Sequence, residues 1–109
     1  MRKGNIFLAA PNRSREEFFE PLIASGKVRI ERIISHSNSS PEGFWYDQEE
    51  SEWVMVVSGS AAIRIEGEEQ ILILRAGDWI DIPPRLRHRV EWTDPVQKTV
   101  WLAVFYDRK

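Results

Sequence analysis

The residues able to do chemistry are few in this chain, and two of them are favourably placed. Its 109 residues include no cysteine and only two histidines, His36 and His88. Thiolate catalysis, disulfides and a site with three histidine ligands from one chain are therefore excluded. Glu52 opens the apolar run 52–57, and His88 lies near the start of the segment 87–92. Each is therefore placed at the beginning of a predicted strand.

Glu52 and His88 admit three interpretations. As metal ligands they need a third donor, Gln48 or alternatively Tyr46, which gives one imidazole and two oxygen ligands. Such a mixed set suits one divalent ion of zinc, iron, manganese or nickel. As a metal-free pair they would transfer protons, with both pKa values tuned by burial and by each other. As a structural pair they would form a hydrogen bond and bind nothing. The cofactor is thus one divalent ion or none.

Strand periodicity decides which side chains share a face, because alternate residues of a strand point the same way. Tyr46, Gln48 and Glu52 have the same parity. On the later strand His88 and Trp92 share a face, whereas the residues of opposite parity between them are charged and should face solvent. In the absence of a bulge, Glu52 and His88 are both predicted to point inward.

The segments that position Glu52 and His88 are predicted to be strands. Short apolar or alternating runs recur at intervals of about 8–12 residues, separated by turns rich in glycine and proline, which is typical of an all-β sandwich or barrel. The predicted strands cover residues 28–34, 52–57, 61–65, 71–74, 79–82, 87–92 and 99–106.

The first 27 residues show a different pattern. Ser14 and Glu17 fit a capping box, and Gly26 is a plausible helix stop. Between them, four apolar residues recur at helical spacing: Phe18, Phe19, Leu22 and Ile23. We therefore predict a short helix at about residues 15–24, in an N-terminal extension (1–27) that precedes the barrel (28–106). The whole chain, 1–109, reads as a single domain.

The composition of the chain limits the classes of partner that we expect it to bind. The chain has 15 basic and 17 acidic residues, a net charge of -2 and 42% hydrophobic residues. A basic stripe of the kind that binds nucleic acid is missing, and so is an apolar stretch long enough to cross a membrane. The partner expected is a small molecule, with no nucleic acid and no membrane, in a cytoplasmic protein.

Two motifs resemble the signatures of the cupin superfamily. The segment EWVMVVSG, from Glu52 to Gly59, matches the second half of the first motif. The segment GDWIDIPPRLRH, from Gly77 to His88, matches most of the second motif. The chain is thus similar to small single-domain bacterial cupins over residues 28–106. The resemblance implies a jelly-roll, or double-stranded β-helix, barrel with a metal or ligand pocket inside.

The departures from the motifs affect the site. The two histidines of the first motif fall on Tyr46 and Gln48, or with the longer spacing on Trp45 and Asp47. Of the four metal-binding residues of the superfamily, only Glu52 and His88 remain. The resemblance therefore implies a cupin with a degenerate first motif.

Arg32 and the tryptophans are further candidates for ligand binding. Arg32 has the parity of the apolar residues of its strand, so it would clamp a substrate carboxylate or pair with Glu52. Alternatively, Ile33 faces inward and Arg32 is solvated. Trp92 and Trp101, with Tyr46, are the aromatic pocket candidates. Trp53 and Trp79 have the outer parity and suit an interface or the N-terminal helix.

These observations lead to one functional hypothesis and two alternatives. The first is a metal-dependent oxygenase, isomerase or lyase that acts on a small polar metabolite. The second is a non-enzymatic cupin that binds a small molecule in a metal-free pocket, and the third is a barrel without a ligand. A homodimer is expected, because pairing edge strands across a two-fold axis protects them, and the cupin resemblance also implies one.

Overall fold

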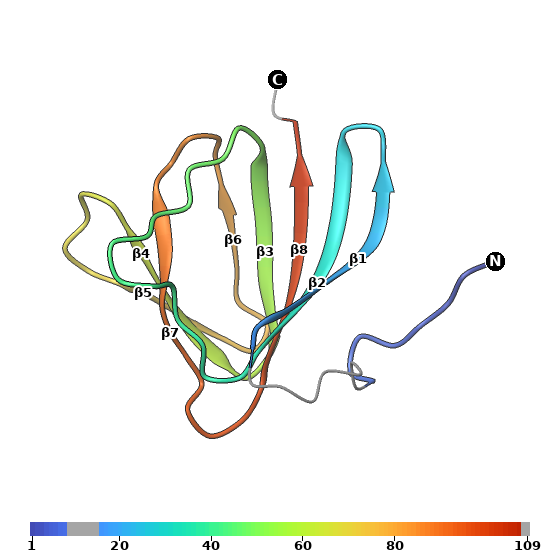
Figure 1. The fold of residues 1–109 in the computed structure, drawn as a ribbon, viewed down its shortest axis with the longest axis horizontal. Helices are drawn as coiled ribbons and strands as arrows, with labels where there is room; N and C mark the ends of the chain where they lie inside the picture. Colours follow the sequence, from blue (N-terminus) through green and yellow to red (C-terminus); the bar gives the residue numbers. More distant parts are fainter. Residues whose placement is uncertain (9–15, 108–109) are drawn as a thin grey trace.

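The computed structural model describes residues 1–8 and 16–107, and in this part of the chain all regular structure is β (Figure 1). The strands expected between 28 and 106 are confirmed, with ends shifted by one residue or none. The eight strands are β1 (Phe18–Ser25), β2 (Val28–Ser35), β3 (Ser51–Ser58), β4 (Ser60–Ile65), β5 (Leu72–Arg75), β6 (Trp79–Ile82), β7 (His88–Thr93) and β8 (Thr99–Tyr106).

The strands form two antiparallel sheets that face each other. One has the order β1-β2-β8-β3-β6 and the other the order β5-β4-β7. The chain passes from the first sheet to the second between β3 and β4, at Gly59. Gly59 has a φ of 85°, and an added Cβ would lie 2.6 Å from the carbonyl oxygen of Lys98. Only glycine fits this crossing, because the backbone conformation and the contact both exclude a side chain.

The core lies between the sheets. Buried side chains of the larger sheet, including Val54, Val56 and Trp101, pack against Ala61 and Ile63 of the smaller one. Each fully buried aliphatic side chain of this kind stabilises the fold by roughly 1.5–3 kcal/mol. The alternation along β3 and β8 therefore fixes which residues line the interior of the barrel.

The predicted N-terminal helix is wrong. Residues 18–25 form the edge strand β1, which pairs with β2 from Phe18↔Ile34 to Ser25↔Val28. Pro21, which lacks an amide donor, is tolerated because β1 is an edge strand and its register shifts between Pro21 and Ile23. The free edge of β2 satisfies the backbone of this segment, which outweighs its local helical pattern. Ser14 of the expected capping box lies outside the described residues.

A bulge in β7 overturns one prediction of side-chain direction. Ala62 pairs with Trp92, but its neighbour Ile63 pairs with Val90, so Glu91 is an extra residue. The bulge reverses the parity beyond it. His88 and Val90 face the interior, whereas Trp92 lies on the opposite face with Ala62. The expectation that His88 and Trp92 share one face is therefore wrong.

The outer face of the larger sheet carries the two tryptophans that were predicted to lie outside the barrel. Trp53 and Trp79, from β3 and β6, lie with ring centroids 5.8 Å apart, and Trp79 is 57% exposed. The parity prediction that placed them outside the barrel agrees with this. The structure, as far as it is described, also contains no helix of the length and apolarity needed to cross a membrane.

Candidate functional site

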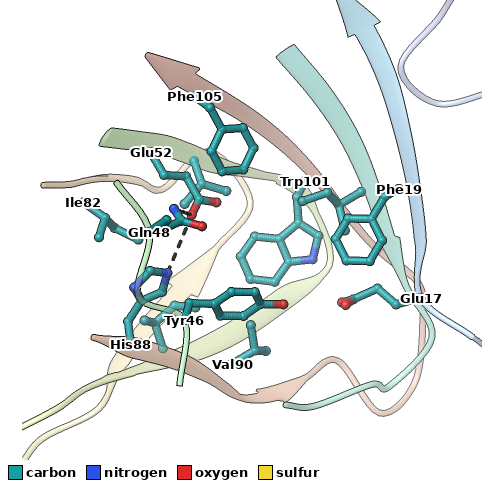
Figure 2. A pocket seen from close by; sticks show the side chains of 13 residues that line it. Glu17, Phe19, Tyr46, Gln48, Glu52, Ile82, His88, Val90, Trp101 and Phe105 are labelled. Carbon is teal, nitrogen blue, oxygen red and sulfur yellow. Dashed lines mark hydrogen bonds and ion pairs between the residues drawn. The ribbon is translucent and has the colours of Figure 1, made fainter. Parts of the chain in front are cut away.

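A cavity of about 70 Å³ lies inside the barrel, between the two sheets (Figure 2). It is lined by residues of both sheets, of the segment before β1 and of the segment before β3. Its lining residues are Glu17, Phe19, Ile33, Tyr46, Gln48, Glu52, Val54, Ile63, Ile82, His88, Val90, Trp101 and Phe105. Most of this lining is apolar, so its few polar groups act in a weakly polar environment.

His88 lines the cavity from strand β7. The residue is 3% exposed, and its Nδ1 lies 2.8 Å from the carbonyl oxygen of Leu86. A carbonyl oxygen only accepts hydrogen bonds, so in this contact Nδ1 carries the proton. In the neutral ring Nε2 then has a free lone pair. It lies 3.6 Å from Oε1 of Glu52, which is longer than a hydrogen bond.

Glu52 is held in place by an amide. Nε2 of Gln48 donates a 2.9 Å hydrogen bond to Oε1 of Glu52, which is 9% exposed. Glu52 belongs to β3 of the larger sheet, whereas His88 belongs to β7 of the smaller one. The pair therefore spans the interior of the barrel from one sheet to the other.

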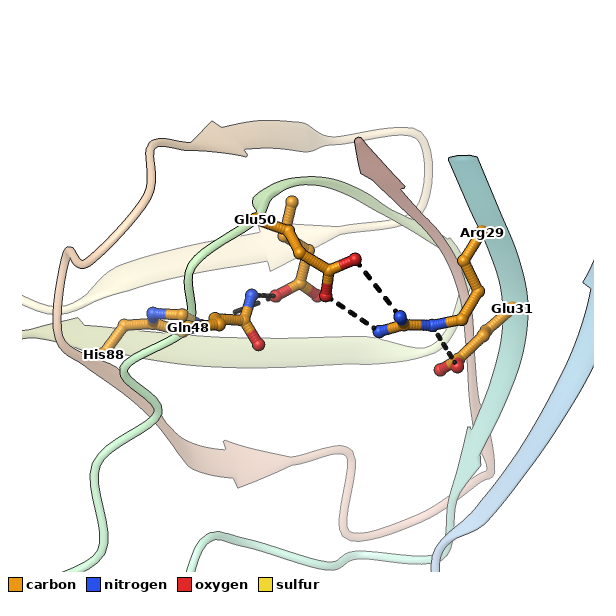
Figure 3. A network of polar contacts seen from close by, with 6 residues as sticks. Arg29, Glu31, Gln48, Glu50 and His88 are labelled. Atoms are coloured by element: carbon orange, nitrogen blue, oxygen red, sulfur yellow. Dashed lines mark hydrogen bonds and ion pairs between the residues drawn. The ribbon is translucent and has the colours of Figure 1, made fainter. Parts of the chain in front are cut away.

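An ion-pair network fixes the segment that carries Gln48 (Figure 3). The two terminal nitrogens of Arg29 each lie 3.2 Å from a carboxylate oxygen of Glu50, and its Nε lies 2.9 Å from Glu31. The guanidinium also lies 4.2 Å above the ring of Phe105, which lines the cavity. Glu50 is thus tied to β2, close to the position where Gln48 enters the pocket.

Tyr46 is attached to His88 through the backbone. Its amide donates to the His88 carbonyl at 2.7 Å, the His88 amide donates back at 3.2 Å, and the two rings stack with centroids 5.4 Å apart. Burial raises the pKa of the Tyr46 phenol, and the negative charges of Glu17 and Glu52 raise it further. The phenol therefore stays protonated at neutral pH and is able to donate a hydrogen bond.

Glu17 is a second carboxylate in the cavity. The hydroxyl of Ser35 donates to it at 2.5 Å, and Nε1 of Trp101 donates to the same hydroxyl at 3.0 Å. Ser35 and Trp101 are buried and Glu17 is half-buried, so this row of hydrogen bonds runs from the core to the edge of the cavity. Figure 2 shows Glu17 and Glu52 on opposite sides of the Trp101 ring.

The structure brings most of the sequence candidates together. Tyr46, Gln48, Glu52, His88 and Trp101 all line the same cavity. Their role as metal or ligand contacts stays a prediction. Trp92 does not line the cavity, because the bulge in β7 turns it away.

Arg32 also lies away from the cavity. Ile33 lines it instead, and Arg32 points to the other face of β2. There Nη2 of Arg32 lies 2.6 Å from Glu20, and Nη1 donates to the Leu8 carbonyl at 2.6 Å. The residue is only 6% exposed, so it is neither the inward clamp nor the solvated side chain of the two sequence interpretations.

The sequence analysis missed Glu17 and Phe19. Both line the cavity from the N-terminal side, and Phe19 pairs with Ile33 across β1 and β2. Their alternation, with Phe18 and Glu20 on the opposite face, is a strand signal. The helical spacing of the apolar residues hid it.

The protein's own donors fit a metal ion only in part. A separation of 3.6 Å between Nε2 of His88 and Oε1 of Glu52 is close to the span of two ligands at about 2.1 Å from one ion. However, Gln48 turns its nitrogen, and not its oxygen, toward Glu52. In the described part of the chain, His, Asp and Glu residues form no group of three or more suited to hold a metal. Two donors are one fewer than catalytic zinc sites use.

Comparisons with known proteins agree with the fold and the motifs. The Cupin domain family matches residues 33–105, so the chain belongs to the cupin family. A crystal structure from Ralstonia eutropha, provisionally named a mannose-6-phosphate isomerase, is 49% identical, covers 99% of this chain and 100% of its own, and has a TM-score of 0.94. No curated protein matches the chain.

More distant structures share the fold alone. A cupin from Methanocaldococcus jannaschii with a double-stranded β-helix fold is 12% identical, with a TM-score of 0.69 and coverage of 91% of this chain and 87% of its own. The polyketide cyclase RemF from Streptomyces resistomycificus is 19% identical, with a TM-score of 0.76 and coverage of 99% and 80%. The protein therefore has the cupin double-stranded β-helix fold.

Proposed function

We propose that this cupin is an isomerase that transfers protons within a small polar metabolite, with His88 and Glu52 as its acid–base pair. One observation carries the proposal. The free Nε2 of His88 faces the Glu52 carboxylate at 3.6 Å inside a mostly apolar cavity, and no direct hydrogen bond joins them. A substrate group that lies beside the pair is therefore able to contact both Nε2 of His88 and the Glu52 carboxylate. The name of the 49% identical protein supports the isomerase class.

The three polar groups have distinct roles in such a reaction. Nε2 of His88 accepts a proton from the carbon next to a carbonyl group, which gives an enediolate. The Tyr46 phenol donates a hydrogen bond to the oxygen on which negative charge develops. Glu52 moves the hydroxyl proton between the two oxygens, and His88 returns its proton to the neighbouring carbon. Atoms and charge balance, because the product is an isomer of the substrate.

The test is hydrogen exchange at carbon. The protein is incubated in deuterated water with a panel of small hydroxyaldehydes and hydroxyketones, and NMR follows deuterium entry and isomer formation. Acid–base residues typically contribute about 100-fold to 10,000-fold in rate, so His88→Ala and Glu52→Gln should each lose at least about 100-fold. His36→Ala is the matched control, because His36 does not line the cavity. Equal exchange in wild type and His88→Ala would refute the proposal.

A metal-dependent reaction is the second candidate. The 3.6 Å separation between His88 Nε2 and Glu52 Oε1 favours a metal ion. The small number of protein donors, two among the described residues, counts against it. Mass spectrometry of protein purified without chelator, then loaded with zinc, iron(II), manganese or nickel, decides between the two candidates. Metal that disappears in both His88→Ala and Glu52→Gln would support the second. If neither metal nor exchange is found, two alternatives remain: a cupin that binds a small molecule without metal, and a barrel without a ligand.

A further inference from the structure

We propose that the cavity is selective for a small cationic ligand, an amine or quaternary ammonium group, and that it rejects phosphorylated sugars. The proposal rests on the proposed function in one respect, since both concern the same cavity. It specifies the charge of the ligand, which the acid–base chemistry leaves open.

The described side chains that line the cavity include negative charges and no lysine or arginine to balance them. Among the thirteen described residues that line the cavity, Glu17 and Glu52 are acidic and none is lysine or arginine. Each carboxylate receives a hydrogen bond from a neutral group, the Ser35 hydroxyl for Glu17 and the Gln48 amide for Glu52. The nearby cation Arg29 is already engaged by two other carboxylates. A ligand with positive charge would compensate the buried Glu52 carboxylate and the half-buried Glu17 carboxylate, whereas an anion would be repelled by both.

The lining of the cavity is also rich in aromatic rings. Phe19, Tyr46, Trp101 and Phe105 all border the cavity, and Figure 2 shows them on several sides of it. The faces of aromatic rings are electron-rich and attract ammonium groups, with tryptophan the most effective. Aromatic rings combined with carboxylates form a cage that suits a cation with an apolar surface. Neutral polyols gain less from such a lining, because the faces of the rings offer no hydrogen bonds to their hydroxyl groups.

The electrostatic effect of the two carboxylates extends to Tyr46. The charges of Glu17 and Glu52 both add to the rise in the pKa of its phenol, after the larger effect of burial. The interior of the cavity is therefore an environment that disfavours a further negative charge. A phosphate group would bring between one and two such charges at neutral pH.

The size of the cavity limits the ligand. A volume of about 70 Å³ accommodates roughly five to seven groups the size of a water molecule. Tetramethylammonium, tert-butanol and inorganic phosphate each have five heavy atoms and a compact, branched shape. They differ mainly in charge, so they separate the effect of charge from that of size.

The experiment is a titration of the full chain with these three probes at constant ionic strength. NMR follows the indole N–H of Trp101, assigned with Trp101→Phe, because this ring borders the cavity. We expect tetramethylammonium to shift this signal and to bind at least tenfold more tightly than tert-butanol, with no binding of phosphate. Phosphate or tert-butanol binding as tightly as tetramethylammonium, or no binding of any probe, would overturn the proposal.

Variants show whether the carboxylates are responsible. Glu17→Gln and Glu52→Gln should each weaken tetramethylammonium at least about tenfold and leave tert-butanol unchanged, in proteins whose NMR spectra show a retained fold. Glu49→Gln, which removes an exposed carboxylate outside the cavity lining, should change neither. Unchanged tetramethylammonium binding in both cavity variants would overturn the proposal.

The two proposals fail separately. Tetramethylammonium binding without carbon exchange supports the cationic ligand and refutes the isomerase. Exchange that depends on His88, in a protein that does not bind tetramethylammonium, supports the isomerase and refutes the cationic ligand.

Discussion

The carbonyl oxygen of Leu86 lies 2.8 Å from Nδ1 of His88, and this contact determines which ring nitrogen faces the cavity. The acceptor belongs to the backbone two residues earlier in the chain, so it cannot be removed by a change of side chain. Orientation of a functional imidazole by a carbonyl through its other nitrogen is a common arrangement in enzyme and metal sites.

The first prediction concerns the tautomer of His88. We expect the neutral imidazole to carry its proton on Nδ1, because the Leu86 carbonyl accepts from it. ¹⁵N NMR of imidazole-labelled protein distinguishes the two tautomers, and His36 provides a second histidine in the same sample. A neutral His88 with its proton on Nε2 would contradict the orientation on which the acid–base role depends.

The second prediction concerns the crossing between the sheets. Gly59→Ala would place a Cβ 2.6 Å from the Lys98 carbonyl oxygen and 2.8 Å from Cα of Thr99, at a φ of 85°. We expect a loss of about 3 kcal/mol or more in the free energy of unfolding, measured with urea. Gly67→Ala is the matched control, because Gly67 has a φ of 89° and no atom within 4 Å of the added Cβ. Equal losses would show that the steric contact contributes nothing.

The third prediction concerns acid stability and Asp94. The pKa of this carboxyl is lowered chiefly because the Val96 amide donates to it, with smaller contributions from Ser60 and Gln97 and an opposing effect of burial. The unfolded chain therefore takes up the proton first as the pH falls. The stability from Asp94 is fully present above the unfolded pKa, about 4, and is lost as the pH falls through the lower folded value.

Asp94→Asn should accordingly destabilise the protein at neutral pH, and its difference from wild type should shrink in acid. Urea unfolding at pH 7, 5 and 3 measures this trend, with the exposed Asp107→Asn as control. A difference that is the same at all three pH values would show that the charge of Asp94 is not what stabilises the fold.

The fourth prediction concerns Arg32 and the N-terminal segment. Arg32 joins β2 to Glu20 of β1 and to the Leu8 carbonyl, both at 2.6 Å. Removal of hydrogen bonds to a charged group costs about 1.5–3 kcal/mol each, so Arg32→Met should destabilise the protein and expose residues 1–8 to proteases. Mass spectrometry after brief proteolysis measures the effect. Ligand binding in the cavity should not change, because Arg32 lies on the outer face; a large change would contradict this placement.

The fifth prediction concerns the homodimer, which stays a prediction. The outer face of the larger sheet carries apolar side chains, among them Trp79, which is 57% exposed. Exposed apolar patches of this kind commonly mark interfaces, and we expect a second copy of the chain to cover this one. Sedimentation velocity should show a dimer for wild type and a monomer for Trp79→Glu. A monomeric wild type would refute the prediction.

The barrel strands and the inward placement of Glu52 and His88 were predictable because their signals are local. Alternation and turn residues marked β2 to β8, and the spacing from Glu52 to Gly59 and from Gly77 to His88 indicated the cupin motifs. The misplacement of Trp92 had another cause: a one-residue bulge leaves no clear trace in a sequence, yet it reverses the side-chain direction beyond it.

The N-terminal region could not be predicted in the same way. The segment from Phe18 to Ser25 has a locally helical pattern, and its strand conformation depends on the free edge of β2. The environment of Arg32 also depends on the pairing of β1 with β2, because only this pairing brings Glu20 next to Arg32. Such long-range effects override local propensity.

The edge position of β1 affects how easily the shape and charge of this pocket can be changed. Glu17 and Phe19 complete the cavity wall from a segment that is hydrogen-bonded on one side only, to β2, and that lies outside the rest of the barrel. Substitutions in this segment can alter the shape and charge of the pocket without disturbing Glu52, His88 or the strands that hold them. We therefore expect the N-terminal strand to tolerate exchange for the corresponding segment of a related chain. Chimeras that carry this segment from related chains offer a direct route to altered ligand preference with Glu52 and His88 unchanged.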